Sequence, residues 1–117
     1  MGFLTTHVLD TAQGKPGSNM SVSLFRIANN QRQLLSQQIT NSDGRCDGPL
    51  LQHEAFSVAV YALEFGVEEY FKQAGVVQPT PPFLTDGTLR FGIAQADEHY
   101  HVPLLVSPYS YSTYRGS

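Results

Sequence analysis

The feature that most limits the fold is an alternation of apolar and polar residues that recurs in short segments along the chain. An alternation with a period of two is typical of β-strands that bury one face. Clusters of Gly, Pro, Asn, Asp and Ser separate these segments and are typical of turns and loops. The sequence therefore predicts strands within residues 3–10, 20–28, 33–40, 56–65 and 88–94.

The segment 56–65 is apolar on both of its alternating faces. Phe56, Val58 and Val60 share one face, and Tyr61 and Leu63 lie on the other. A strand with two apolar faces is typical of a position that is covered on both sides. We therefore expect this segment to be a central strand with two-sided burial.

One short helix is expected after this strand. Val67, Tyr70, Phe71 and Ala74 follow the i, i+3, i+4, i+7 spacing of an apolar helical stripe. Gly75 suits the position just after a helix end. Seven or eight strands with a single helix do not alternate as an α/β fold requires. The pattern favours an all-β fold, an antiparallel β-sandwich.

The last nineteen residues predict two strands joined at Ser107 and Pro108. A chain end is usually frayed, but this one keeps aromatic and β-favouring residues to its end. We expect it to be held in a sheet. In the first of the two strands, one face carries Tyr100, Val102, Leu104 and Val106, and the other carries His99, His101, Pro103, Leu105 and Ser107.

Size and composition narrow the class of protein. A chain of 117 residues is expected to form one domain, residues 1–117. Charged residues make up 15%, against about 25% in typical proteins, while apolar content is an ordinary 41%. This balance points to a surface partly covered by another subunit. The net charge of −3 and the lack of a Lys/Arg cluster argue against nucleic-acid binding.

Features of compartment and membrane attachment are also absent from the sequence. The single cysteine, Cys46, allows no intrachain disulfide and gives no reason to expect an oxidising compartment. The start lacks the pattern of a signal peptide, and no apolar run reaches about 18 residues. We expect a soluble cytoplasmic protein without a membrane partner.

The candidate chemical residues have unremarkable interpretations when each is taken alone. His99 and His101 share a strand face, but a zinc site needs three or four ligands and no acid or Cys spacing completes one. No metal is therefore expected. His7 and His101 lie in apolar strands, which by itself favours buried, hydrogen-bonded histidines. Arg45, between two Asp-Gly pairs, is typical of a solvated turn.

Three segments together change that interpretation. They are His7-Val-Leu-Asp10, Gly44-Arg45-Cys-Asp-Gly48 and the ending Tyr-Ser-Thr-Tyr-Arg-Gly-Ser117. The chain resembles the 5-hydroxyisourate hydrolases, the transthyretin-related proteins of purine breakdown, over nearly its whole length. The resemblance implies a transthyretin-like sandwich of two four-stranded sheets with one helix. It also implies a homotetramer, a dimer of dimers with sites in the channel between the dimers.

The resemblance implies a site and a reaction. The substrate would be 5-hydroxyisourate and the product 2-oxo-4-hydroxy-4-carboxy-5-ureidoimidazoline, formed by water attack on a ring carbonyl. Neutral imidazole suits the base and guanidinium suits the developing negative charge, so no cofactor is expected, and either histidine fits the base. The implied catalytic residues are His7, Arg45 and His101, and the implied substrate-binding residues are His7, Arg45, Tyr114, Arg115, Gly116 and Ser117.

Two other functions remain open from the sequence. A transthyretin-like carrier of a small ligand would use the same channel, but His7, Arg45, His101 and Tyr114 would fill and polarise it. A structural or adhesion sandwich would have no small-molecule site. It would also leave the Arg-Gly-Ser end without a role.

Overall fold

A computed structural model describes residues 2–116. Its helical segments are the 3₁₀ turn η1 (His53–Ala55) and the α-helix α1 (Val67–Gln73). The strands in chain order are β1 (Phe3–Thr5), β2 (Val8–Asp10), β3 (Lys15–Pro16), β4 (Ser21–Ala28), β5 (Gln31–Ile39), β6 (Leu51–Gln52), β7 (Ala59–Phe65), β8 (Gly87–Ile93), β9 (Tyr100–His101), β10 (Leu104–Ser107) and β11 (Ser110–Ser112).

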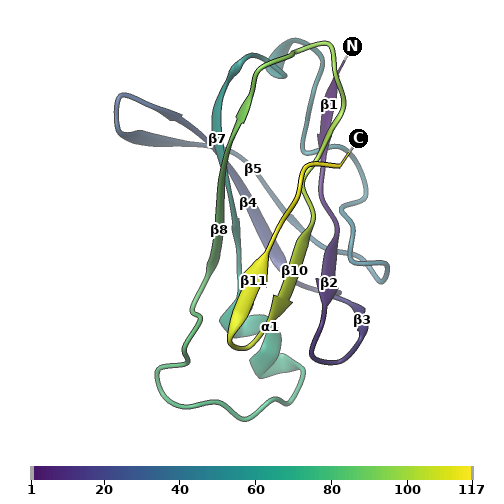
Figure 1. The fold of residues 1–117 in the computed structure, drawn as a ribbon, viewed down its shortest axis with the longest axis vertical. Coiled ribbons are helices and arrows are strands. Elements are labelled where there is room, and N and C mark those ends of the chain that lie inside the picture. The colour runs from purple at the N-terminus through teal and green to yellow at the C-terminus, as the bar shows by residue number, and fades with distance from the viewer. Residues whose placement is uncertain (1, 117) are drawn as a thin grey trace.

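The strands form two layers (Figure 1). One layer is the antiparallel sheet β5-β4-β7-β8, whose β4–β5 hairpin projects away from the body of the molecule. The other consists of two sets of shorter strands, β6-β1-β9 and β3-β2-β10-β11. These two sets are continuous along the chain, since β2 follows β1 and β10 follows β9. The all-β sandwich with one helix is therefore confirmed.

Two of the expected long strands are interrupted in this second layer. The interruptions fall at Thr6–His7 and at Val102–Pro103, and they lie side by side. The N–H of Val102 donates to the Thr5 carbonyl (2.9 Å), and the N–H of Leu104 donates to the His7 carbonyl (2.9 Å). The two segments therefore run together through the break.

This pair of interrupted strands is parallel, unlike the rest of the sandwich. β1 pairs with β9 and β2 pairs with β10, both in parallel register. Antiparallel order is natural for strands joined by a hairpin, whereas parallel strands need a long connection. Here the connection is most of the chain, because the first and the penultimate long strands are neighbours in space. The beginning of the chain and residues 99–107 thus form one surface.

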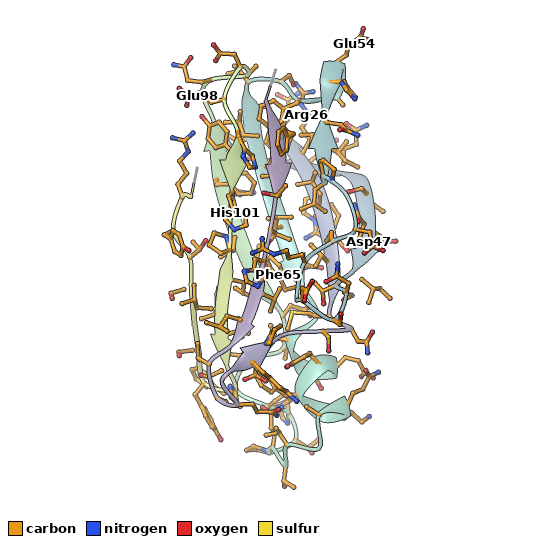
Figure 2. All side chains as sticks on the ribbon, turned by 90° about the vertical axis from the view of Figure 1, so that its right-hand side faces the viewer. Arg26, Asp47, Glu54, Phe65, Glu98 and His101 are labelled. Atoms are coloured by element: carbon orange, nitrogen blue, oxygen red, sulfur yellow. The ribbon has the colours of Figure 1, made fainter. Side chains whose placement is uncertain are left out.

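The predicted alternation holds along this pair. Leu4, Thr6 and Val8 are buried, whereas Phe3 and Leu9 are exposed on the outer face. Figure 2 shows the side chains that fill the space between the layers, with Phe65 labelled near the centre. The largest fully buried side chains are Tyr61, Phe65, Phe71, Leu4, Met20, Leu24, Leu63, Ile93, Leu104, Val8, Val22 and Val67.

The expectation of two-sided burial for residues 56–65 is wrong. β7 is an inner strand of its sheet, as expected, but Val58 is 61% exposed and Val60 is 43% exposed. A sandwich covers only the inner face of each sheet. The outer face of β7 therefore has no layer above it in the single chain.

The helix and the final hairpin follow the sequence closely. Val67, Tyr70 and Phe71 are the buried residues of α1, and Gly75 takes the left-handed conformation after it (φ +81°). The strands β10 and β11 pair around the predicted turn, although β11 ends at Ser112. Within residues 2–116, no helix is both long and apolar enough to cross a membrane.

Candidate active site

The parallel strand pair places the two candidate histidines on one face. Thr5 is the register partner of His101. Because side chains alternate, His7 lies on the same outer face as Thr5, two residues farther along the chain. Figure 2 shows His101 near the middle of the long axis, far from Glu54 and Glu98 at one end. Thr5 and His101 therefore lie on paired strands near the middle of the molecule.

A tight turn brings Arg45 to these strands. The side-chain oxygen of Asn41 accepts hydrogen bonds from the N–H groups of Asp43 (2.9 Å) and Arg45 (3.2 Å). Gly44 has φ +76°, and a Cβ there would lie 2.5 Å from the Val8 carbonyl oxygen. Glycine is thus required both by the left-handed backbone and by the close approach to β2. As a result, Arg45 forms an isolated antiparallel bridge with His7.

The end of the chain returns to His101. The N–H of Gly116 donates to the His101 carbonyl (2.7 Å), and the N–H of His101 donates to the Gly116 carbonyl (3.3 Å). A Cβ on Gly116 would lie 3.0 Å from the ring carbon Cδ2 of His101. The absence of a side chain at Gly116 therefore lets this segment pass directly beside the imidazole. The structure thus brings His7, Arg45, His101 and Gly116 together through two backbone bridges, and their roles in catalysis and substrate binding stay predictions.

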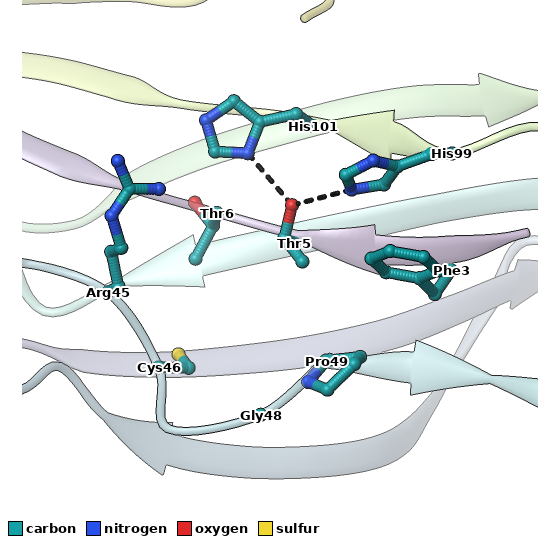
Figure 3. Close-up of a pocket in the computed structure, with 9 residues that line it drawn as sticks. All are labelled: Phe3, Thr5, Thr6, Arg45, Cys46, Gly48, Pro49, His99 and His101. Atoms are coloured by element: carbon teal, nitrogen blue, oxygen red, sulfur yellow. Dashed lines mark hydrogen bonds between the residues drawn. The ribbon is translucent and has the colours of Figure 1, made fainter. Parts of the chain in front are cut away.

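A cavity of about 430 Å³ opens beside these residues (Figure 3). A volume of this size is typical of sites for small molecules. Its wall combines apolar and polar groups from three parts of the chain. The lining residues are Phe3, Thr5, Thr6, Arg45, Cys46, Gly48, Pro49, His99 and His101.

The electrostatics of the cavity favour a neutral His101. Burial lowers the pKa of His101, and the positive charge of Arg45 lowers it further, with smaller effects from His7 and His99. A neutral imidazole can accept a proton near pH 7. The salt bridges among residues 2–116 join Arg32 to Glu64 and Arg115 to Glu98. The charge of Arg45 therefore has no acidic partner within that range and is available to a ligand.

Cys46 lines the cavity next to Arg45. Burial and, to a lesser extent, the negative charge of Asp47 raise the pKa of its thiol. A protonated thiol is a poor nucleophile. Cys46 therefore contributes to the cavity wall as a small apolar side chain.

Two predicted site residues lie apart from this cluster. The Arg115 guanidinium donates to Glu98 (3.0 Å) and lies over the Tyr100 ring, 4.2 Å from its centroid. Tyr114 and Arg115 border a second, more apolar hollow of about 230 Å³. Their part in substrate binding stays a prediction, and Ser117 lies outside the described residues.

No group of three or more His, Cys, Asp or Glu side chains within residues 2–116 is arranged to hold a metal ion. His101 of β9 and His99, which precedes β9, instead share a hydroxyl partner. Thr5 Oγ1 lies 2.8 Å from Nδ1 of His101 and 3.1 Å from Nε2 of His99. These bonds fix the rings beside the cavity.

Comparison with known proteins shows which family this chain belongs to. The sequence profile of the HIUase/Transthyretin family matches residues 4–116. The chain belongs to this family. Among its relatives, the 5-hydroxyisourate hydrolase of Ralstonia nicotianae is 59% identical over 117 residues, all of both chains. The solved 5-hydroxyisourate hydrolase of Klebsiella pneumoniae is 31% identical, with a TM-score of 0.82 and full coverage of both chains.

A second similar structure comes from a protein that is longer than this chain. The structure of an (S)-allantoin synthase is 48% identical, with a TM-score of 0.94 over 99% of this chain. The chain spans 44% of that protein. The family fold therefore also occurs as part of a larger chain.

Of the residues that line the cavity, the sequence-based prediction named only Arg45 and His101; it missed Phe3, Thr5, Thr6, Cys46, Gly48, Pro49 and His99. Thr5 carried a signal, because it stands two residues before His7 on the same alternating face. The sequence did not identify its partner, because no local pattern predicts that Thr5 pairs with His101. The proximity of Cys46 followed only from the path of the turn.

Proposed function

We propose that this protein hydrolyses 5-hydroxyisourate to 2-oxo-4-hydroxy-4-carboxy-5-ureidoimidazoline. The observation that carries the proposal is the meeting of segments that are distant in the sequence: Arg45 and His101 line one cavity, and His7 forms a backbone bridge to Arg45. Relatives that bear the name 5-hydroxyisourate hydrolase align over the whole chain, the Ralstonia protein at 59% identity. The proposal places the reaction in urate degradation.

The reaction needs a base, a source of positive charge and a proton for the leaving nitrogen. One imidazole takes a proton from water while the water oxygen forms a bond to a ring carbonyl carbon. The carbonyl electrons move to oxygen, and the Arg45 guanidinium stabilises that oxyanion. When the C–N bond breaks, the nitrogen takes a proton from the second imidazole. The new carboxylic acid then returns a proton to the second imidazole as it ionises, and the proton taken up by the base is released, so one proton leaves in each turnover.

His101 fits the role of base because its lowered pKa keeps it neutral at pH 7. His7 then acts on the substrate or the leaving nitrogen. Tyr114, Arg115, Gly116 and Ser117 complete the proposed pocket. Gly116 supports this role through its bridge to His101, and the scheme requires no cofactor.

The proposed assembly is a homotetramer, two dimers packed face to face with the sites in the channel between them. Support comes from the outer face of β2 and β10, where Leu9 and Leu105 are register partners. Leu9 is 38% exposed and Tyr114 is 59% exposed in the single chain. A second subunit would cover this apolar face. A monomer in sedimentation at micromolar concentration would refute the tetramer, and the cytoplasm stays the predicted compartment.

The activity is tested by generating 5-hydroxyisourate with urate oxidase and following its ultraviolet decay with and without the protein. We expect His7→Asn and His101→Asn each to lower turnover by about 100-fold or more, as for loss of a general base or acid. His53→Asn is the matched control, because His53 is exposed in η1 and lies outside the cavity. Full turnover by both site variants would refute the site.

A further inference from the structure

The imidazole of His101 is held by contacts on two of its edges. On one edge, Thr5 Oγ1 lies 2.8 Å from Nδ1 (Figure 3). On the other edge, Gly116 passes so close that a Cβ there would lie 3.0 Å from Cδ2. A half-turn of the ring would exchange Nδ1 and Cδ2, because both atoms are bonded to Cγ. The hydrogen bond to Thr5 therefore distinguishes one orientation of the ring from the other.

The sheet places Thr5 for this contact. Thr5 and His101 are register partners in the parallel pair of β1 and β9, and the N–H of Val102 donates to the Thr5 carbonyl (2.9 Å). Threonine is branched at Cβ, so its side chain is restricted around χ1. The position of Oγ1 is thus set by the paired backbones and by a stiff side chain.

The proton of a neutral His101 ring can lie on either nitrogen, and the surroundings favour Nδ1. Figure 3 shows Nε2 on the side of the ring toward Arg45, and the charge of Arg45 acts on this ring. A positive charge attracts the lone pair of a bare nitrogen and repels an N–H group. Nε2 is therefore favoured as the bare nitrogen, and the proton lies on Nδ1, next to Thr5 Oγ1.

His99 completes this arrangement of hydrogen bonds. When Nδ1–H of His101 donates to Thr5, the single hydroxyl proton of Thr5 is left to donate elsewhere. Nε2 of His99 lies 3.1 Å from Thr5 Oγ1 and is its other hydrogen-bond partner among residues 2–116. The ring of His99 stacks on Phe3 with centroids 4.0 Å apart. A neutral His99 with its proton on Nδ1 thus accepts the hydroxyl proton and leaves the oxygen of Thr5 to accept from His101.

We propose that Thr5 is a positioning residue for the base: its hydroxyl accepts a hydrogen bond from Nδ1–H of His101, keeps Nε2 free to take a proton from water, and is held in this direction by His99. This inference rests on the proposed hydrolysis with His101 as the base. The Nδ1 proton stays on His101 throughout the reaction. Only Nε2 gains a proton from water and then loses it to the solvent, so His101 returns to its starting tautomer.

Steady-state kinetics separate positioning of the base from binding of the substrate. Thr5→Val keeps the branched shape of the side chain and removes the hydroxyl. We expect kcat to fall about 10-fold, the effect of one hydrogen bond on the equilibrium between the two tautomers. KM should stay within about 2-fold, because a hydroxyl that bound the substrate directly would raise KM when removed. An unchanged kcat, with or without a rise in KM, would overturn the proposal.

Further variants complete the design. Thr5→Ser brings back a hydroxyl and should recover most of the lost kcat. Thr11→Val is the matched control, because Thr11 Oγ1 donates to the Val106 carbonyl (3.1 Å) outside the cavity. It should turn over as the wild-type protein does. A loss in Thr5→Ser as large as that in Thr5→Val would show that shape and not the hydroxyl matters, against the proposal.

Two changes at His99 test the second hydrogen bond. His99→Leu removes the acceptor for the Thr5 hydroxyl proton, whereas His99→Gln keeps an oxygen that can accept it. Without an acceptor, the hydroxyl is free to donate to Nδ1 of His101, which moves the ring proton to Nε2. We therefore expect His99→Leu to lose more kcat than His99→Gln. The reverse order would overturn the role of His99.

Nitrogen NMR of the histidine rings reads the tautomer without turnover. Near neutral pH, we expect His101 of the wild-type protein to be neutral with its proton on Nδ1. Thr5→Val should raise the share of His101 that carries its proton on Nε2, whereas Thr11→Val should leave that share unchanged. A wild-type His101 with its proton on Nε2 would overturn the proposal. An inactive wild-type protein would instead overturn the proposed hydrolysis, whatever tautomer His101 shows.

Discussion

Replacing Arg45 separates two effects of one charge, and both are measurable in the same experiment. Arg45 contributes positive charge to the cavity and has no acidic partner among the side chains described. Its loss in Arg45→Gln is therefore not offset by the release of a paired carboxylate. Removing one group that stabilises an oxyanion costs about 10²–10³ in turnover, or about 2.7–4 kcal/mol. We expect a loss of that size at the plateau of the pH profile.

The second effect is a shift of the pH profile. The active form of His101 is neutral, so activity falls as the pH drops through its pKa, which lies below the ordinary value of about 6.5. Burial is the larger cause of that lowering and Arg45 is the next. Arg45→Gln removes only the smaller of these two causes, so the pKa rises part of the way back. The acid limb of the profile should move to higher pH.

Arg45→Lys distinguishes charge from geometry. Lysine keeps the positive charge but lacks the planar donor fork of arginine. We expect the acid limb to stay near its wild-type position while the plateau falls. Arg32→Gln is the control, because Arg32 forms an exposed ion pair with Glu64, and such pairs contribute about 0–1 kcal/mol.

The assay is the ultraviolet decay of freshly generated 5-hydroxyisourate from about pH 5 to pH 8, corrected for the decay without protein. The reasoning is refuted if Arg45→Gln loses less than about 10-fold at the plateau. It is also refuted if the acid limb of Arg45→Gln stays in place or moves to lower pH, because the charge would then not act on the base.

Two stability comparisons test how the site is held. Gly44→Ala and Gly14→Ala each place a side chain on left-handed backbone, at a cost of about 1–2 kcal/mol, but only at Gly44 does the new carbon meet a backbone oxygen of β2, at 2.5 Å. We therefore expect both variants to lower the urea midpoint of unfolding, and only Gly44→Ala to lose turnover. Equal turnover by the two variants would contradict the role of the Gly44 turn in placing Arg45. Tyr70→Phe removes a hydrogen bond (2.8 Å) to the buried carboxylate of Asp10, and should cost about 1.5–3 kcal/mol. The matched change Tyr61→Phe removes a hydrogen bond to the neutral carbonyl of Ser57 (2.8 Å) and should lower the free energy of unfolding by less, about 1 kcal/mol. A larger loss for Tyr61→Phe than for Tyr70→Phe would contradict the stronger hydrogen bond assigned to the charged carboxylate.

The sequence predicted those features that depend on local pattern. Alternation placed His101 on the face opposite Tyr100, Val102, Leu104 and Val106, and the structure agrees. The turn composition around Gly44 predicted a loop that presents Arg45. The Gly75 signal correctly ended the helix. In each case the information lies in residues within a few positions of one another.

The features that the sequence did not specify depend on long-range pairing. The parallel pairing of β1 with β9 joins residues about as far apart as the chain allows, and no local signal specifies it. Val58 and Val60 are apolar but exposed in the single chain. Periodicity shows which residues share a face of a strand, but it does not show whether another layer covers that face. The direction of the Arg115 side chain depends on Glu98, a partner seventeen positions away.

The alternation that defines the strands also separates stability from chemistry in this protein. Leu4 and Val8 point inward into the core, while Thr5 and His7 between them point outward to the site. The core residues fix the spacing of the strands, and thereby the distances between the outward groups. A change of an outward residue removes little packing, so its effect on turnover reports chemistry more than folding. This arrangement lets one sandwich carry different sites on its outer face without rebuilding its interior.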